Sequence, residues 1–166
     1  MSEHDPDRFA LKAGIEAPVD GRQSAAAMEI RRGVGRLLRR LAFAMVPELT
    51  LASGRRADIV AVGPKSEIWI VEIKSSLADF RADHKWPDYR AHCDRLFFAT
   101  RAEVPLEVFP EAAGLILADT FGAEILREAP EHRIAGATRK QVMLRLAQVA
   151  AGRLHDLEDP PLAGLI

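Results

Sequence analysis

Cysteine is almost absent from this sequence, since Cys93 is the only one among its 166 residues. A single cysteine excludes an internal disulfide framework and a zinc site built on several thiolates. A protein without disulfides suits a reducing compartment, so we expect a cytoplasmic protein. Cys93 lies just before an apolar stretch at residues 96–98, and we expect its thiol to be buried and not nucleophilic.

Long apolar runs are also missing. No stretch approaches the roughly 20 apolar residues of a membrane helix, and the N-terminus is polar and mixed in charge, unlike a signal peptide. The hydrophobic share of 48% is nevertheless enough for a sizeable core. We expect a flexible tail over residues 1–20, a single domain over residues 21–156 and a second tail over residues 157–166.

Lysine is scarce beside arginine, and the net charge of −1 conceals an asymmetry along the chain. Six arginines and one acid lie between Arg22 and Arg40, whereas seven acids and one arginine lie between Glu103 and Glu131. A basic segment beside an acidic one is typical of a protein with one face prepared for a polyanion. A helix with a solvated charged face explains the same charges equally well.

Apolar periodicity and turn residues divide the chain into helices and strands. We expect helices over residues 24–42 and 138–154, and a helical stretch over residues 77–92 that Pro87 divides into two pieces. The expected buried face of the last helix is Val142, Leu146, Val149 and Ala150. We expect strands over residues 46–51, 57–62, 67–74, 95–100, 114–118 and 123–127. The first three strands have short connections, as in an antiparallel meander, and the whole order predicts one α/β domain.

Two charged residues interrupt the apolar stretch IVEIKSS at residues 70–76. Side chains two positions apart on a strand point to the same face, so Glu72 and Lys74 stand side by side. Asp58 interrupts the preceding strand. If the two strands pair as a hairpin, Asp58 can lie beside Glu72. Burying such charges is costly unless they are paired or bind a metal.

Two explanations fit this cluster. Two carboxylates brought close repel each other unless a positive charge lies between them. Lys74 can neutralise one of them in a structural ion pair. A divalent cation can hold both, and hard oxygen ligands on a partly hydrated site suit Mg²⁺ or Mn²⁺. A lysine that orients a water beside such a metal would complete a hydrolytic site.

Asp58 followed by Glu72-Ile73-Lys74 resembles the PD-(D/E)XK nuclease superfamily, which implies a restriction-endonuclease-like core with a central mixed sheet flanked by helices. More narrowly, three stretches resemble the MmcB-type DNA repair proteins, which are predicted endonucleases. These stretches are SGRRADIVAV, EIWIVEIKSSLADFRADHKWPDYRAHCDRLFFAT and GLILADTFGAEILREAP. The resemblance runs from about Ser24 to Leu154, nearly the whole expected domain.

The resemblance assigns roles to residues by position. Asp58 and Glu72 would be metal ligands, with the carbonyl of Ile73 as a third ligand and Mg²⁺ or Mn²⁺ as the cofactor. Lys74 would position or activate the attacking water. Ala57 stands where the superfamily pattern has proline, a departure that removes no ligand.

Many members of the superfamily supply an earlier acid to the metal. Glu48, in VPELTL, is our candidate for that ligand, and a solvent-facing strand residue is the alternative interpretation. Glu29 is a weaker candidate because it lies off the apolar face of its helix.

The segment KWPDY is similar to the Gln-x-x-x-Tyr signature of RecB-like nucleases, with Lys85 in place of the glutamine. Residues four apart on a helix share a face, so we expect Lys85 and Tyr89 to contact a phosphate together. Trp86 is expected either to stack on an unpaired base or to pack in the core. Arginines of the first helix and the first hairpin would bind phosphates without reading sequence. These arginines are Arg36, Arg39, Arg40, Arg55 and Arg56.

Together these features predict a metal-dependent DNA endonuclease of DNA repair, associated with the nucleoid and directed by DNA structure or by repair-protein partners. No helix-turn-helix or zinc finger is present to read bases. A non-catalytic DNA-binding or scaffolding module on the same fold would use the same arginines and would reduce Glu72 and Lys74 to an ion pair. RNA cleavage stays open, because nothing in the sequence detects a 2′-hydroxyl.

Overall fold

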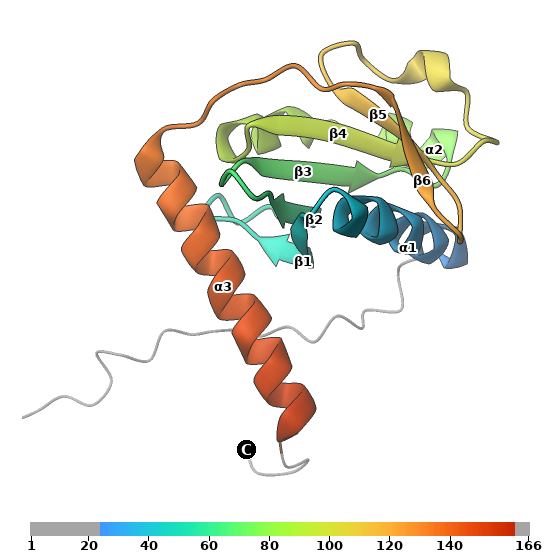
Figure 1. Ribbon diagram of the computed structural model, residues 1–166. Coiled ribbons are helices and arrows are strands. Elements are labelled where there is room, and N and C mark those ends of the chain that lie inside the picture. The colour runs from blue at the N-terminus through green and yellow to red at the C-terminus, as the bar shows by residue number, and fades with distance from the viewer. Residues whose placement is uncertain (1–23, 162–166) are drawn as a thin grey trace, which may run out of the picture.

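The computed structural model describes residues 24–161, in which six strands form one mixed sheet in the order β1-β2-β3-β4-β5-β6 (Figure 1). The strands are β1 Ala44–Thr50, β2 Arg56–Val62, β3 Ile68–Ile73, β4 Arg95–Thr100, β5 Gly114–Ala118 and β6 Ala123–Arg127. Strands β3, β4 and β5 run parallel, and the other neighbouring pairs are antiparallel. The predicted α/β class and the antiparallel meander of the first three strands are confirmed.

Helices lie on both faces of this sheet. They are α1 Ala25–Arg40, α2 Leu77–Ala82 and α3 Gly136–Glu158, with the 3₁₀ helices η2 Trp86–His92 and η3 Leu106–Val108. The prediction of two helical pieces is confirmed, but the break lies at residues 83–85, and Pro87 lies in the first turn of the second piece. The predicted second tail begins too early, since α3 continues through Glu158. The predicted N-terminal tail lies outside the described residues.

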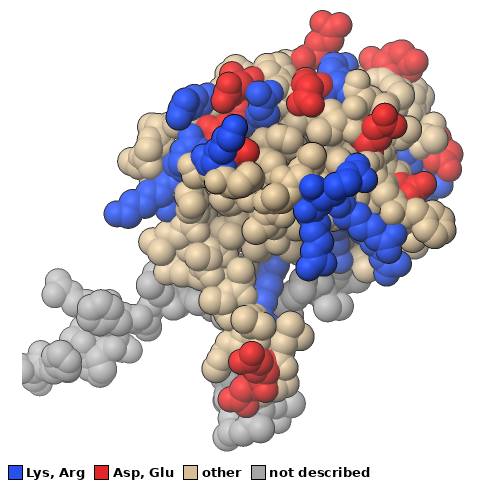
Figure 2. Space-filling model, in the orientation of Figure 1, with Lys and Arg blue, Asp and Glu red and all other residues tan. Residues whose placement is uncertain are grey.

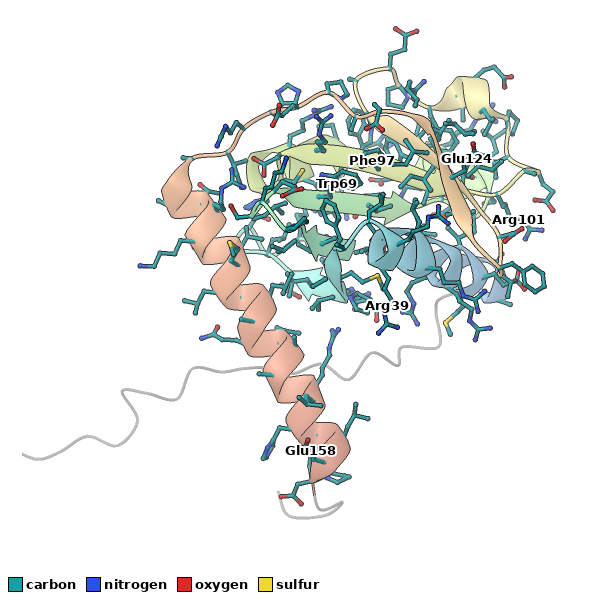
Figure 3. The ribbon with its side chains drawn as sticks, viewed as in Figure 1. Arg39, Trp69, Phe97, Arg101, Glu124 and Glu158 are labelled. Atoms are coloured by element: carbon teal, nitrogen blue, oxygen red, sulfur yellow. The ribbon has the colours of Figure 1, made fainter. Side chains whose placement is uncertain are left out.

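Helix α1 covers one face of the sheet with an apolar stripe. The hydroxyl of Ser24 accepts the backbone N–H of Ala27 at 3.1 Å and caps the helix. In the core that α1 covers, Trp69 and Phe97 pack with ring centroids 4.7 Å apart (Figure 3). The residues that α1 itself buries are Ile30, Gly33, Val34, Leu37 and Leu38. Gly33 is required, because a Cβ there would collide with the carbonyl oxygens of the β5–β6 turn.

The opposite face of the sheet carries η2 and α3. Val142 of α3 is buried, and Leu146 and Val149 pack half-buried against the cluster formed by β1 to β4 and η2. Ala150, which was expected on this buried face, is exposed, because it lies about 100° around the helix from its half-buried neighbour Val149. Cys93 is buried in the same cluster, and burial raises the pKa of its thiol to about 12. The prediction of a buried, unreactive thiol agrees with this placement.

Buried Asp94 fastens the start of α3 to the sheet. Its carboxylate accepts two hydrogen bonds from the guanidinium of Arg139, at 2.6 and 2.8 Å. It also accepts the backbone N–H groups of Ile68 and Ile134, at 2.8 and 3.1 Å. Further along α3, Arg153 donates to the carbonyl of Pro47 at 2.7 Å, so α3 also covers the edge strand β1.

None of the helices within residues 24–161 is long and apolar enough to cross a membrane.

Candidate functional site

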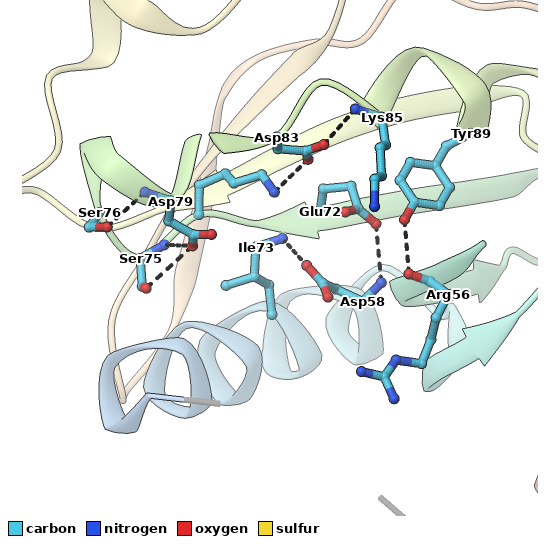
Figure 4. Close-up of polar contacts among 11 residues, drawn as sticks. Arg56, Asp58, Glu72, Ile73, Ser75, Ser76, Asp79, Asp83, Lys85 and Tyr89 are labelled. Atoms are coloured by element: carbon cyan, nitrogen blue, oxygen red, sulfur yellow. Dashed lines mark hydrogen bonds and ion pairs between the residues drawn. The ribbon is translucent and has the colours of Figure 1, made fainter. Parts of the chain in front are cut away.

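Strands β2 and β3 separate where Asp58 and Glu72 oppose each other. The backbone ladder ends at the pair Ile59 and Val71, one position before the two acids. There the side chains replace the ladder (Figure 4): the N–H of Asp58 donates to Glu72 Oε1 at 3.1 Å, and the N–H of Ile73 donates to Asp58 Oδ2 at 2.7 Å. The two carboxylates therefore lie side by side at the open end of the hairpin, as the sequence predicted.

The surroundings of this pair disfavour two negative charges. Burial raises the pKa of Asp58 despite the hydrogen bond from Ile73 and the nearby ammonium of Lys74. Burial raises the pKa of Glu72 well above its ordinary value, and the charge of Asp58 raises it further. A cation placed between the carboxylates would relieve both effects, whereas the hydrogen bonds alone do not.

Lys74 is held by an acid that the sequence analysis did not assign to the site. Its Nζ lies 2.6 Å from Asp83 Oδ2, and the two side chains are only 7% and 14% exposed. Burial lowers the pKa of Lys74, but the ion pair with Asp83 outweighs this and the pKa is raised. Lys74 therefore carries a fixed ammonium group. Asp83 follows α2 in the chain, and only its acidic type, close to the KWPDY segment, signalled a role.

These residues line an open cavity of about 400 Å³ at the carboxyl end of β3. Its walls come from the sheet, from the segment between β3 and β4, and from the first residues of α1. The residues that line it include Asp58, Glu72, Ile73, Lys74, Asp79, Asp83, Lys85, Tyr89, Arg56, Ser24 and Ala27. Acids therefore face three basic side chains across a space large enough for a hydrated ion and a phosphate.

The donor set fits a hard divalent cation. Within residues 24–161 no group of three or more His, Cys, Asp or Glu side chains is arranged to hold a metal. The protein ligands on offer are therefore the two carboxylates of Asp58 and Glu72, with the backbone of Ile73 beside them. Such a set suits Mg²⁺, which keeps several waters and binds through one or two carboxylates plus a substrate phosphate.

Glu48 lies on the neighbouring strand β1, at the position opposite Asp58. The β1–β2 ladder passes from Pro47 to Leu49 and skips Glu48, which has a positive φ of 52°. The negative charge of Glu48 contributes to the raised pKa of Asp58, so the two carboxyls are near each other. Glu48 does not line the cavity. Glu29, the weaker candidate, lines hollows elsewhere on α1, away from the carboxylate pair.

The arginines of α1 lie on the other side of the sheet from the carboxylates. Glu72 shares a face of β3 with Ile70, which packs against η2 and α3, whereas α1 covers Val71 and Ile73. Figure 2 shows basic side chains gathered over α1, and Figure 3 places Arg39 among them. Two of these arginines also have structural partners. Arg36 donates to the carbonyls of Thr120 and Phe121 at 3.1 and 2.9 Å, and Arg40 donates to that of Ala123 at 3.4 Å.

The first hairpin and η2 bring further predicted residues to the cavity. Arg56 lines it, whereas Arg55 forms an ion pair with Asp88, with Nη2 and Oδ2 3.0 Å apart. Tyr89 is buried and its hydroxyl donates to the carbonyl of Arg56 at 2.9 Å. Lys85 and Tyr89 both line the cavity, but the expected shared helix face is wrong. The segment is a 3₁₀ helix with Pro87 in its first turn, and Lys85 only precedes it.

Trp86 packs in the core. Its ring meets Phe98 edge-on, with centroids 5.5 Å apart and planes at 73°. The side chain is half-buried between two apolar clusters, and Trp86 does not line the cavity. Of the two roles expected for Trp86, this placement favours packing over base stacking.

The fold and the site define an α/β protein whose mixed sheet opens at a buried glutamate and a half-buried aspartate, beside a lysine held in an ion pair. The family model described as "DNA repair protein MmcB-like" matches residues 15–161. The chain therefore belongs to the MmcB-like DNA repair protein family. Among solved structures it is similar to the SPO1766 protein of unknown function from Silicibacter pomeroyi, at 44% identity and a TM-score of 0.81. That match covers 87% of this chain and 99% of the other. A comparison with curated proteins gives no match.

Proposed function

We propose that this protein is a Mg²⁺- or Mn²⁺-dependent DNA endonuclease that hydrolyses phosphodiester bonds during DNA repair, on a PD-(D/E)XK type of core. The observation that carries the proposal is the side-by-side placement of Asp58 and Glu72 at the open end of the β2–β3 hairpin, with Lys74 on the same face. Membership in a DNA repair family supports DNA as the substrate.

In this proposal Asp58, Glu72 and the carbonyl of Ile73 hold the metal, and Glu48 adds negative charge from the neighbouring strand. A bound Mg²⁺ or Mn²⁺ supplies a water of lowered pKa and neutralises charge that builds on the phosphate. The two carboxylates lie at a fixed separation because each accepts a backbone N–H of the opposite strand. Preorganised ligands of this kind need little rearrangement when the ion binds.

Lys74 orients the attacking water and stabilises negative charge on the phosphate. Its ion pair with Asp83 fixes the ammonium in place over the cavity. A charged lysine donates hydrogen bonds but cannot accept a proton. We therefore assign Lys74 to orientation and electrostatic stabilisation, and not to proton removal.

The DNA backbone approaches the cavity past Lys85 and Arg56. Both line the cavity, and basic side chains that contact phosphate give affinity without reading sequence. The arginines on α1 form a second basic surface on the other side of the sheet, where a longer or bent substrate continues. Recognition in this proposal is directed by DNA structure or by repair-protein partners.

A non-catalytic DNA-binding module is the second candidate function. Two observations favour it: Lys74 is already paired with Asp83, and the described residues offer only two carboxylates to a metal. In that case Asp58 and Glu72 serve to close the end of the hairpin.

One experiment separates the two functions. The purified full chain is incubated with duplex, single-stranded, flap and bubble DNA and with matched RNA, in Mg²⁺, Mn²⁺ or EDTA. The nuclease proposal predicts metal-dependent cleavage of at least one DNA, its loss in Glu72→Gln, and its retention in the control Glu107→Gln, an exposed acid far along the chain. Binding without cleavage in every metal would favour the module, and cleavage confined to RNA would correct the substrate.

A further inference from the structure

Helix α3 has exposed apolar residues on the face turned away from the sheet. The helix contacts the sheet as far as Arg153, which donates to the carbonyl of Pro47 on β1, and its end extends beyond the sheet, with Glu158 at the far end (Figures 1 and 3). Opposite the packed face, Leu144 and Leu154 are 56% and 57% exposed. A helix buried on one face alone would carry polar residues at these positions.

The exposed residues on this face follow a regular spacing. Steps of four and three residues alternate along α3, which is the spacing of a helix–helix seam. Six residues make up this seam, and all of them are exposed: Lys140, Leu144, Ala147, Ala151, Leu154 and Glu158. The alanines at its centre allow two helix backbones to approach closely.

The seam is also symmetric about Val149. Leu144 and Leu154 lie at equal distances along the chain from this centre, as do Ala147 and Ala151. An antiparallel pair of identical helices, related by a twofold axis, sets each residue against the residue at the mirrored position. Each leucine would thus meet a leucine of the other copy, and each alanine an alanine.

The ends of the seam are complementary in charge. Lys140 and Glu158 occupy mirrored positions, so an antiparallel pair sets the ammonium of one copy against the carboxylate of the other. A parallel pair would instead set lysine against lysine and glutamate against glutamate, which is unfavourable. The charges therefore favour the antiparallel arrangement.

A hollow beside the seam offers space for a side chain from a second copy. It has a volume of about 330 Å³, and Leu51, Ala52 and Leu144 contribute to its walls. In the antiparallel arrangement Leu154 of the second copy lies against Leu144 at the mouth of this hollow. A leucine that enters it removes apolar surface from water on both copies.

We propose that the outward seam of α3 binds α3 of a second copy of this chain, as an antiparallel, twofold-symmetric homodimer. This inference does not rest on the proposed nuclease function. The seam has six residues a side, far fewer than the roughly 20–30 of a standard stable interface. The dimer is therefore expected to dissociate at micromolar concentrations.

The test is sedimentation velocity of the full chain from micromolar to submillimolar concentration. The wild type should shift from monomer to dimer across this range. Leu144→Glu and Leu154→Glu should each weaken the dimer by at least about tenfold. Each substitution occurs twice in the interface, because the twofold axis relates the two copies. The matched control is Leu126→Glu, an exposed leucine on β6 that lies off the seam, and it should dimerise like the wild type.

A charge exchange tests the orientation of the helices. Lys140→Glu should weaken the dimer by about threefold or more, since it faces Glu158 of the other copy, and the double variant Lys140→Glu with Glu158→Lys should restore it. Circular dichroism of each variant shows whether α3 is intact. If the wild type stays monomeric over the whole concentration range, the proposal is overturned. This holds also if residues 1–23 or a different protein cover the seam. A dimer that Leu144→Glu leaves unchanged also overturns the proposal.

Discussion

The ammonium of Lys74 lies 2.6 Å from the carboxylate of Asp83, and both groups are nearly excluded from solvent. The two residues come from different elements, since Lys74 follows β3 and Asp83 follows α2. The ion pair fixes the direction of the lysine over the carboxylates of Asp58 and Glu72. It also holds the segment between β3 and β4, which contributes Asp83, against the site.

We therefore expect Asp83→Asn to destabilise the metal-free protein by about 1.5–3 kcal/mol, the range for a hydrogen bond to a charged group. The nearby carboxylates of Asp58 and Glu72 compensate in part, which places the loss toward the lower end. Urea unfolding monitored by tryptophan fluorescence measures it. Asp88→Asn is the matched control, because its pair with Arg55 is exposed and should be worth at most about 1 kcal/mol. Equal effects of the two substitutions would show that the Lys74–Asp83 pair contributes no more than a surface pair.

Gly33 is expected to be intolerant of any side chain. A Cβ at this position would collide with the carbonyl oxygens of Asp119 and Gly122, which belong to the backbone and cannot turn away. Gly33→Ala should therefore destabilise the fold by about 1–3 kcal/mol, as overpacking does. Gly136 is the control, since a Cβ there meets nothing within 4 Å at the first turn of α3. Gly136→Ala should raise the melting temperature through helix propensity. A neutral Gly33→Ala would mean that the β5–β6 turn does not lie against α1.

Acid should weaken the attachment of α3 through Asp94. The carboxylate is buried, which alone raises its pKa, but the hydrogen bonds from Arg139, Ile68 and Ile134 outweigh burial and lower the pKa below the ordinary 3.8. A carboxyl with a lowered pKa in the folded state stabilises the protein above about pH 4 and loses this contribution as the pH falls further. Asp94→Asn should be less stable than the wild type at neutral pH, and the difference should shrink below pH 4. Urea unfolding between neutral pH and about pH 3 tests this, and a constant difference would contradict it.

Binding to DNA should depend on salt through the basic residues at the cavity. Each phosphate contact contributes roughly 0.9 to the slope of log K against log salt on duplex DNA. Lys85→Ala should reduce the slope by about that amount for every sequence alike. Replacing Arg36, Arg39 and Arg40 together by alanine tests the surface on α1 in the same way. Fluorescence anisotropy at several salt concentrations measures both, and an unchanged slope removes the substituted surface from the DNA interface.

Local patterns in the sequence predict most of the helices and strands of the fold. The last three strands begin and end where alternation and turn residues predict, and the meander of β1 to β3 follows from its short connections. The hairpin brings Asp58 within reach of Glu72, but the sequence leaves the register open, and the structure pairs Ile59 with Val71 so that the two acids oppose each other. Ends of helices are less predictable. Helix α3 continues to Glu158 because no strong stop signal precedes Asp159.

Contacts between distant segments could not be predicted. Asp83 meets Lys74, and Asp94 meets Arg139, only after the crossover and α3 have packed on the sheet. The sequence likewise does not specify which face of the sheet α1 covers, so its arginines could not be placed relative to the carboxylates. The expected helical pairing of Lys85 and Tyr89 failed because Lys85 precedes the helix and the helix is 3₁₀, so that its side chains repeat every three residues.

The metal response of Asp58→Asn tests the central claim most directly, since it needs no substrate. Asp58 and Glu72 are disfavoured as two bare charges, so the metal-free variant should be as stable as the wild type or slightly more stable. The wild type should gain about 2.7 kcal/mol when free Mn²⁺ exceeds its dissociation constant a hundredfold, and Asp58→Asn should lose most of that gain. Thermal melts of both proteins and of the control Glu107→Gln, in EDTA and across a Mn²⁺ titration at constant ionic strength, measure it. A wild type that does not respond to Mn²⁺, or a response that Asp58→Asn shares in full, would contradict a metal site at these two carboxylates.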